Sequence, residues 1–345
     1  MNANTNRRIR SRTGAPYLIA FSISYEKDAL LRRGLWIEHL RELLVGLARP
    51  LLRVGASIAY GGDWKEGSDN FTYELLRLIN AERENSSQVD APTPIGWLYN
   101  HLAWPLYLQV TPRVEAQWVH CCSILRITQE LARIPPDERA PEQGDTDSDL
   151  HVLNAAITLS AMRRYAAEGM AVEYPDVAPS AGLKVPPQSA RVLLGGKVTG
   201  YSGFLPGLFE EALLALEHRN PLYILGGFGG AAGKLVDALL PGAPGTFPQE
   251  FDPRWQCAQN PKVHRLASLL EAKSLVGNVR DTERALGALR ASIEVARGSL
   301  TTHLNTGLTE DETRELMTTI EMRRAVQLTL TGLERKLSGV ELAPV

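Results

Sequence analysis

The amino-acid sequence predicts an α/β fold, with a parallel sheet flanked by helices and an all-helical extension at the C-terminal end. Continuously apolar runs, typical of buried parallel strands, alternate with segments whose apolar residues recur at helical spacing. Three of these runs end at a pair of glycines, and the sequence beyond residue 250 has only helical patterns. Alternating strands and helices favour a parallel sheet with helices on its faces.

The first part of the chain predicts two strand–helix pairs. Tyr17–Ser24 is an apolar run that ends in hydroxyls and reads as a buried strand. Gly34–Arg53 has apolar residues at helical spacing, and Pro50 should bend or shorten this helix. A second short strand, Ala56–Tyr60, precedes a second helix at Phe71–Glu82. This order indicates a parallel sheet.

The middle of the chain predicts loops and two further strands. Asn85–Pro94 is polar and contains prolines, so we expect a loop. Trp104–Val110 and Cys121–Thr128 are the expected strands. Ile134–Asp149 is rich in Pro, Asp and Glu and predicts a mobile loop, either an idle surface loop or a lid.

A long helix is expected at Leu150–Gly169, with Asp147 or Asp149 as its N-cap and Gly169 at its C-terminal stop. Two more strand–helix pairs follow: Ala190–Leu194 with Pro206–His218, and Pro221–Leu225 with Ala231–Leu240.

The Pro- and Gly-rich segment Pro241–Pro248 predicts a domain boundary. We expect a flexible tail over residues 1–14, a nucleotide-binding α/β domain over residues 15–245, and a helical extension over residues 250–345. The expected helices of the extension are Pro261–Leu275, Thr282–Arg297 and Thr309–Leu337, the last with a capping box of Thr309 and Glu312.

Composition excludes several classes of protein. The 345 residues include 37 Lys and Arg against 39 Asp and Glu, a net charge of −2, with 44% apolar residues. This ordinary globular mixture excludes disordered and fibrous chains. So little net charge gives no global field to attract nucleic acid or an anionic membrane, and it offers little protection against self-association. We therefore expect a homo-oligomer that does not bind nucleic acid.

Membrane, disulfide and metal sites are not indicated. The most apolar stretch, Leu43–Tyr60, is interrupted by Arg49, Pro50 and Arg53, so it is no membrane span. No apolar segment of signal length stands near the N-terminus, which predicts a cytoplasmic protein. Three cysteines and seven scattered histidines show no metal-ligand spacing, so we expect no metal. We expect no other cofactor.

The glycine pairs carry the functional prediction. Gly61-Gly62, Gly195-Gly196 and Gly226-Gly227 each follow a predicted strand, and the last pair extends to Phe228, Gly229 and Gly230. Ligands of parallel sheets bind at the carboxyl ends of strands, and the N-terminus of the next helix suits phosphate. The pattern predicts a phosphate or nucleotide site, the alternative being tight turns without a ligand. P-loop and dinucleotide-fold motifs are missing, which disfavours an ATPase or a dehydrogenase.

Charged residues near these turns are candidates for ligand contacts. A guanidinium of Arg163 or Arg164 can bind a phosphate in a bidentate manner. Glu210 or Glu211 can bind a ribose hydroxyl or assist catalysis. A solvated surface position remains an alternative for each of these four side chains.

The order of these motifs resembles the SLOG superfamily, which groups the lonely-guy phosphoribohydrolases, the Smf/DprA DNA-processing proteins and sensor domains of bacterial conflict systems. The resemblance covers roughly residues 15–245 and is strongest to the modules of antiviral, NAD-linked defence proteins. The matching segments are Ser22–Ser24, Tyr60–Asp63, Ala161–Arg164, Gly195–Lys197, Tyr201–Gly203, Pro206–Glu211 and Tyr223–Gly230.

The resemblance implies a Rossmann-like sheet that binds a nucleotide or nucleotide-derived ligand at its strand ends. The implied ligand-binding residues are Ser22, Ser24, Gly61, Gly62, Asp63, Arg163, Arg164, Gly195, Gly196, Lys197, Ser202, Gly203, Gly226, Gly227, Phe228, Gly229 and Gly230.

Two functions stay open. The hydrolase signature P-G-G-x-G-T-x-x-E is incomplete, because Gly230 replaces its Thr and Gly233 stands where its Glu should be. The chain is therefore expected to be a sensor of a nucleotide-derived signal, such as a cyclic or an NAD-derived nucleotide, with a separate effector chain or assembly as its output. The alternative is a nucleotide N-glycosidase in which Glu210, Glu211 or Asp63 substitutes for the missing carboxylate. A third possibility is an interaction protein with a vestigial site.

Overall fold

The computed structural model describes residues 17–65, 67, 70–84, 97–172, 183–243, 245–272 and 280–337. The tail expected over residues 1–14 and the loop expected at Asn85–Pro94 lie outside these described residues.

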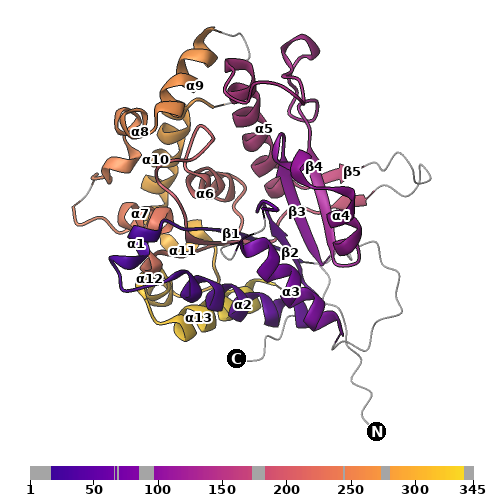
Figure 1. The fold of residues 1–345 in the computed structure, drawn as a ribbon. Helices are drawn as coiled ribbons and strands as arrows, with labels where there is room; N and C mark the ends of the chain where they lie inside the picture. The colour runs from indigo at the N-terminus through magenta and orange to yellow at the C-terminus, as the bar shows by residue number, and fades with distance from the viewer. Residues whose placement is uncertain are drawn as a thin grey trace.

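In the described part of the chain, six parallel strands form one sheet in the order β4-β3-β2-β1-β7-β8 (Figure 1). The predicted α/β class with a parallel sheet is confirmed. From β1 the chain builds β2, β3 and β4 on one side, and later adds β7 and β8 on the other. The strand order therefore reverses between β1 and β7. The strands are β1 Leu18–Ser24, β2 Ser57–Tyr60, β3 Leu98–Ala103, β4 Cys122–Ile127, β7 Ala190–Gly195 and β8 Leu222–Leu225.

Helices cover both faces of the sheet, and β5 (Met170–Val172) with β6 (Leu183–Val185) forms a separate antiparallel pair. The helices before β7 are α1 Lys27–Leu31, α2 Ile37–Arg53, α3 Phe71–Glu84, α4 Pro112–Trp118 and α5 Asp149–Glu168. Those after it are α6 Gly207–Glu217, α7 Gly230–Leu239, α8 Pro253–Gln259, α9 Pro261–Ala272, α10 Thr282–Gly298, α11 Leu300–Leu304, α12 Glu310–Thr318 and α13 Met322–Lys336.

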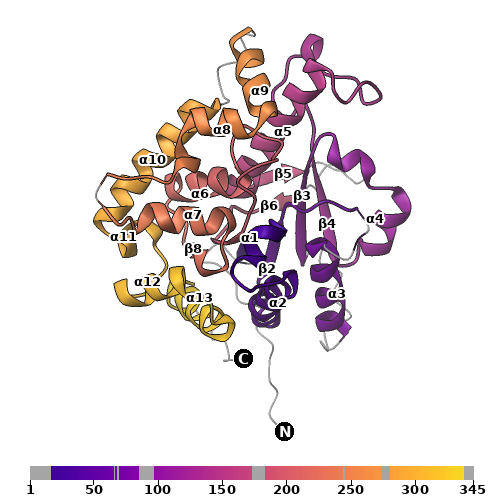
Figure 2. The same ribbon diagram turned by 60° about the vertical axis from the view of Figure 1, so that its left-hand side comes forward.

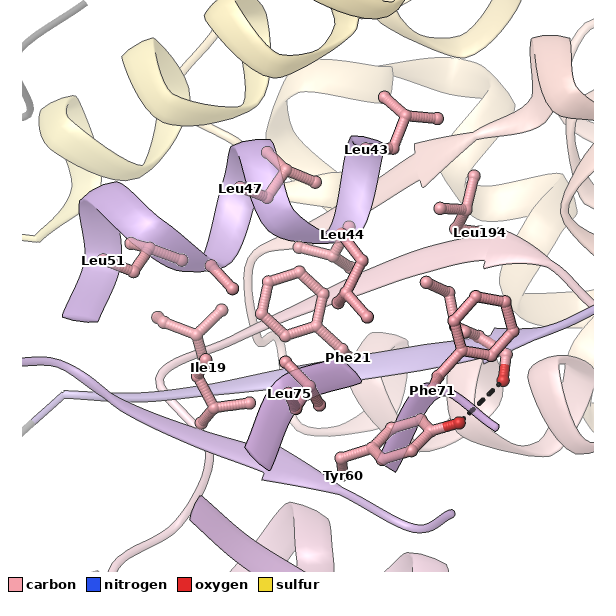
Figure 3. Close-up of a cluster of buried hydrophobic side chains, with 14 of the residues drawn as sticks. Ile19, Phe21, Leu43, Leu44, Leu47, Leu51, Tyr60, Phe71, Leu75 and Leu194 are labelled. Carbon is pink, nitrogen blue, oxygen red and sulfur yellow. Dashed lines mark hydrogen bonds between the residues drawn. The ribbon is translucent and has the colours of Figure 1, made fainter. Parts of the chain in front are cut away.

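The twofold periodicity of β1 divides its side chains between two cores. Ile19 and Phe21 pack against the leucines of α2 and α3 on one face (Figure 3). Leu18 and Ala20 face the opposite cluster, which contains α5. A strand with apolar contacts on both faces explains why Tyr17–Ser24 is apolar throughout rather than alternating.

The C-terminal helices pack directly on the sheet. Helix α13 lies beside α2 in both ribbon views (Figures 1 and 2), and its buried leucines belong to the same cluster as Ile19 and Phe21. The hydroxyl of Tyr223 in β8 donates to the carbonyl of Thr306 over 2.8 Å. The boundary expected near residue 245 stays a prediction, but the helices beyond it complete the core of the sheet.

The strand expected at Trp104–Val110 is wrong. The structure has β3 at Leu98–Ala103, followed by a 3₁₀ turn at Leu106–Gln109. Pro105 cannot donate to a ladder, which excludes a central strand there. The sequence pattern of β3 does not indicate a strand, because the polar residues Asn100 and His101 interrupt its apolar run although both are buried.

Two predicted helix features also need correction. The N-cap of α5 is Ser148, whose hydroxyl accepts from the N–H of His151, and neither neighbouring aspartate caps the helix. The single helix expected at Thr309–Leu337 is two helices, because Glu321 caps α13 by accepting from the N–H of Arg324.

Other local predictions are confirmed. Thr309 and Glu312 form the capping box of α12. Gly169 ends α5 with a φ of +81°, a conformation that favours glycine. By contrast, the expected shortening of the helix at Pro50 does not occur, because α2 continues through Pro50 to Arg53.

The segment expected as a loop before α5 contains one short 3₁₀ turn at Pro136–Glu138. The side chain of Gln129 holds it by exchanging two hydrogen bonds of 2.8 Å with the backbone of Ala140. Among the described residues, no helix is long and apolar enough to cross a membrane.

Gly227 supplies a test of how tightly α12 closes onto the sheet. A Cβ at this position would lie 2.0 Å from the carbonyl oxygen of Thr319. We expect Gly227→Ala to lower the free energy of unfolding by about 1–3 kcal/mol, because backbone must move to accept the methyl group. Gly287→Ala is the control, since nothing lies within 4 Å of its Cβ in helix α10, and it should stabilise by about 0.5–1 kcal/mol. Equal urea midpoints for the Gly227 variant and the parent chain would contradict this packing.

Candidate functional site

A cavity of about 1010 Å³ opens at the carboxyl ends of β1 and β2, where it also meets α5, the loop after β7 and the start of α6. This is the place where the strand order reverses between β1 and β7. Open parallel sheets bind ligands at such a switch point. The sequence-predicted residues that line the cavity are Ser22, Ser24, Gly61, Gly62, Asp63, Arg163, Lys197 and Glu211.

The other sequence-predicted residues do not line this cavity. Glu210 reaches its edge only through Arg163, with which it pairs. Arg164 stacks over the ring of Tyr165 instead. The remaining residues outside the cavity lining are Gly195, Gly196, Ser202, Gly203, Gly226, Gly227, Phe228, Gly229 and Gly230.

The glycine-rich turn after β8 is packed against protein. A Cβ on Gly226 would come within 2.8 Å of the carbonyl oxygen of Met317 in α12. Gly230, at a φ of +63°, would place a Cβ 2.4 Å from the carbonyl oxygen of Gly196. The N–H of Ala231 donates to that same carbonyl over 3.0 Å. These glycines therefore let α7 and α12 approach the ends of β7 and β8.

One wall of the cavity is aromatic. Phe21, Tyr25, Tyr60 and Phe71 line it, and the rings of Tyr25 and Phe71 meet edge to face at 6.5 Å. The hydroxyl of Tyr60 donates to the carbonyl of Ile23 (Figure 3). Burial raises the pKa of Tyr60 far above its ordinary value, so this hydroxyl stays neutral.

The turn after β2 is held rigidly beside that wall. The amide nitrogen of Asn100 donates to the carbonyls of Tyr60 and Gly62, at 3.1 and 2.9 Å. The hydroxyl of Thr72 donates to the carbonyl of Asp63 over 2.8 Å. A Cβ on Gly62 would lie 2.1 Å from the ring of Tyr60, so glycine is required by the protein itself. These contacts fix the position from which the Asp63 side chain enters the cavity.

Two charge pairs lie at the cavity, each with one member in its lining, Arg163 or Glu211. Arg163 from α5 pairs with Glu210, and Arg191 from β7 pairs with Glu211 at 3.2 Å. The guanidinium of Arg163 occupies space left by Gly207, where an added Cβ would come within 2.9 Å of it. The four side chains are mostly buried, and pairing two positive with two negative charges limits the cost of removing them from water.

Arg191 and Glu26 are functional candidates that the sequence patterns did not indicate. Arg191 is fully buried, and its Nη1 donates to the hydroxyl of Ser22 over 2.7 Å. Glu26, which precedes α1, accepts the backbone N–H groups of Val198 and Thr199 at 2.7 and 3.3 Å. A lone arginine inside an apolar strand is the signal that sequence reasoning missed, whereas nothing in the sequence indicates the partners of Glu26.

Several cations surround the cavity opening. Lys27, Arg32, Lys65 and Lys197 line it, and none of them pairs with a carboxylate of the residues that the structure describes. Among those same residues, no group of three or more His, Cys, Asp or Glu side chains could hold a metal ion.

The parallel sheet flanked by helices, with a cavity at its switch point, places the chain among the Rossmann-like α/β proteins. The family model described as SLOG cluster2 matches residues 14–172 and 186–316, and the chain therefore belongs to this family. The match continues across Pro241–Pro248 into α12, beyond the segment in which the sequence motifs lie. A search among curated proteins finds no match.

His101 in β3 gives the folding stability of the protein a measurable pH dependence. Burial, with a further contribution from the charge of Arg191, lowers the pKa of His101 to about 3 from an ordinary value of 6.5. Below pH 6.5 the unfolded chain binds a proton at this position and the folded chain does not. Stability should therefore fall as the pH falls, by roughly 2 kcal/mol between pH 6.5 and pH 4.5.

The check is urea unfolding across that pH window. His101→Leu should remove most of the slope, since it removes the titrating group. His264→Leu, at an exposed position, is the control and should keep the slope. A parent-like slope in the His101 variant would show that other groups cause the dependence.

Proposed function

We propose that this protein binds a nucleotide or nucleotide-derived ligand in the cavity and acts as a sensor in a bacterial defence system. The observation that carries the proposal is the cavity at the β1/β7 switch point, with an aromatic wall on one side and Arg163 on the other. Its volume of about 1010 Å³ is enough for a nucleotide. SLOG domains generally bind nucleotide-derived ligands, which supports the same assignment.

The phosphate end of the ligand would lie at α6. The backbone N–H groups of Gly207 and Leu208 open this helix, and no backbone carbonyl of the described residues accepts from them. Unpaired N–H groups and the helix dipole favour an anion there. Arg163 and Lys197 line the same part of the cavity and add positive charge.

The base would lie at the other end. Phe21, Tyr25 and Phe71 offer apolar ring surface beside the ends of β1 and α3. Ring surfaces of this kind can stack on any base, so they would bind nucleotides in general without selecting one base. This division of the cavity orients the proposed ligand, with its sugar between the two ends.

The sensor reading is preferred because the residues at the glycine signature lack its carboxylate and lie outside the cavity. A separate effector chain and self-association belong to this proposal, and they rest on the resemblance and on the low net charge. A cytoplasmic location also belongs to it, and it rests on the sequence near the N-terminus, which shows no apolar segment of signal length.

The second candidate function is hydrolysis of a nucleotide N-glycosidic bond. The observation in its favour is that Asp63 and Glu211 line the same cavity, where a carboxylate can stabilise an oxocarbenium-like transition state. Glu210 is the weaker candidate, because it pairs with Arg163 and does not line the cavity.

Two adjacent arginines test the binding site. Arg163→Gln should weaken binding of a ribonucleoside 5′-phosphate by roughly 10- to 100-fold, because it removes a charged hydrogen-bond donor from the cavity. Arg164→Gln is the matched control and should bind like the parent chain. Calorimetric titration with a panel of ribonucleotides, including NAD, measures both. Equal losses in the two variants would contradict a specific role for Arg163.

The sensor and the hydrolase differ in turnover. We expect tight binding with no release of free base when the protein is incubated with NAD and nucleoside monophosphates and the products are separated by chromatography. Base release that disappears in Glu211→Gln would establish the hydrolase instead.

A further inference from the structure

We propose that Arg191 determines which cavity-lining groups donate and which accept hydrogen bonds, so that Ser22 donates to the ligand and Glu211 accepts from a ribose hydroxyl. The inference rests on the proposed nucleotide site, and it specifies which kind of sugar that site would select. Arg191 acts through its neighbours and is a positioning residue, because it lies behind the cavity lining.

Arg191 is fixed from three sides. Its Nε donates to the side-chain oxygen of Gln188 over 2.8 Å, and its Nη1 contacts both Ser22 Oγ at 2.7 Å and Glu211 Oε1 at 3.2 Å. The residue is 2% exposed, so a shift of the guanidinium would leave a charge without partners in the interior. Its donors therefore stay directed at the two cavity-lining residues.

This geometry decides what Ser22 can do. A guanidinium has only donors, so the Ser22 oxygen must accept the bond from Arg191. The hydroxyl hydrogen then has no acceptor among the described residues, although Ser22 lines the cavity. Ser22 consequently presents a donor, which suits a phosphate, carbonyl or ether oxygen of a ligand.

The same contact decides what Glu211 can do. Oε1 of this carboxylate pairs with Nη1 of Arg191 at 3.2 Å, and a carboxylate only accepts hydrogen bonds. Glu211 lines the cavity, and Oε2 has no partner among the residues that the structure describes. The Glu211 acceptor and the Ser22 donor, which both contact Nη1 of Arg191, are complementary to a sugar with a free hydroxyl and a neighbouring oxygen.

The ligand class that fits is a ribonucleotide with a free 2′- or 3′-hydroxyl. A deoxy sugar that lacks the hydroxyl bonded to Glu211 would bring no donor there and would leave the carboxylate facing the cavity unpaired. A site built to bond a hydroxyl rejects the analogue that lacks it, because its own polar group is left without a partner.

The test compares sugars rather than absolute affinity. The probe is the ribonucleotide that binds tightest in the panel, together with its 2′-deoxy and 3′-deoxy forms, titrated into the full-length protein by calorimetry. We expect the ribonucleotide to bind at least tenfold more tightly than one of its deoxy forms. Glu211→Gln should reduce that ratio at least threefold, because a charged acceptor is lost while the side chain keeps its shape.

Further variants separate positioning from folding. Arg191→Lys should reduce the ratio in the same direction, whereas Ser22→Ala should weaken ribo and deoxy forms by similar factors. Glu217→Gln, on the same helix but paired with Arg280, is the control and should keep the parent ratio. If Arg191→Lys does not fold, the sugar preferences of the Ser22 and Glu211 variants still test the proposal.

The outcomes are distinguishable. Equal affinities of the parent chain for ribo and deoxy forms would overturn this inference and leave the nucleotide site intact. A parent-like ratio in Glu211→Gln would likewise overturn it. No binding of any nucleotide in the panel would overturn the proposed function itself.

Discussion

The pairing of β1 with β7 is the constraint on which the rest of the structure depends. Six consecutive residue pairs, from Ile19↔Ala190 to Ser24↔Gly195, join strands that are about 170 positions apart in the chain. This pairing places the two halves of the sheet in register and creates the switch point at their shared edge. It also brings Arg191 beside Ser22, so that a charge in one half is satisfied by a hydroxyl in the other. Fold and candidate site are therefore set by the same backbone ladder.

Much of the fold could be predicted from the sequence because its determinants are local. The apolar strand at Tyr17–Ser24, the glycine that ends α5 and the capping box at Thr309 each act within a few residues of themselves. Among the strands of the six-stranded sheet the exception is β3, where the buried polar residues Asn100 and His101 disturb the apolar pattern. The partners of Asn100, which are the indole of Trp64 and the backbone of Tyr60 and Gly62, are distant in sequence and not visible in a local window.

The candidate site was less predictable for the same reason. Arg163 and Glu211 were identified by motif, but Arg191 and Glu26 depend on partners 169 and 172 residues away. The most conspicuous motif, Gly226–Gly230, lies against α12 and the end of β7 rather than in the cavity. Glycine allows close approach by a ligand or by protein backbone, and a sequence does not distinguish the two.

The packing of the C-terminal helix α13 on α2 has a consequence for synthesis. Ile19 of β1 and Leu333 of α13 belong to one buried cluster, although they stand near opposite ends of the described chain. Helices α2 and α3 follow β1 in the chain and can cover this strand early, whereas α13, which packs on α2, emerges from the ribosome only after the rest of the described sheet. Until then the apolar surface of α2 that α13 covers is exposed, and the nascent chain depends on other contacts or on chaperones to avoid aggregation.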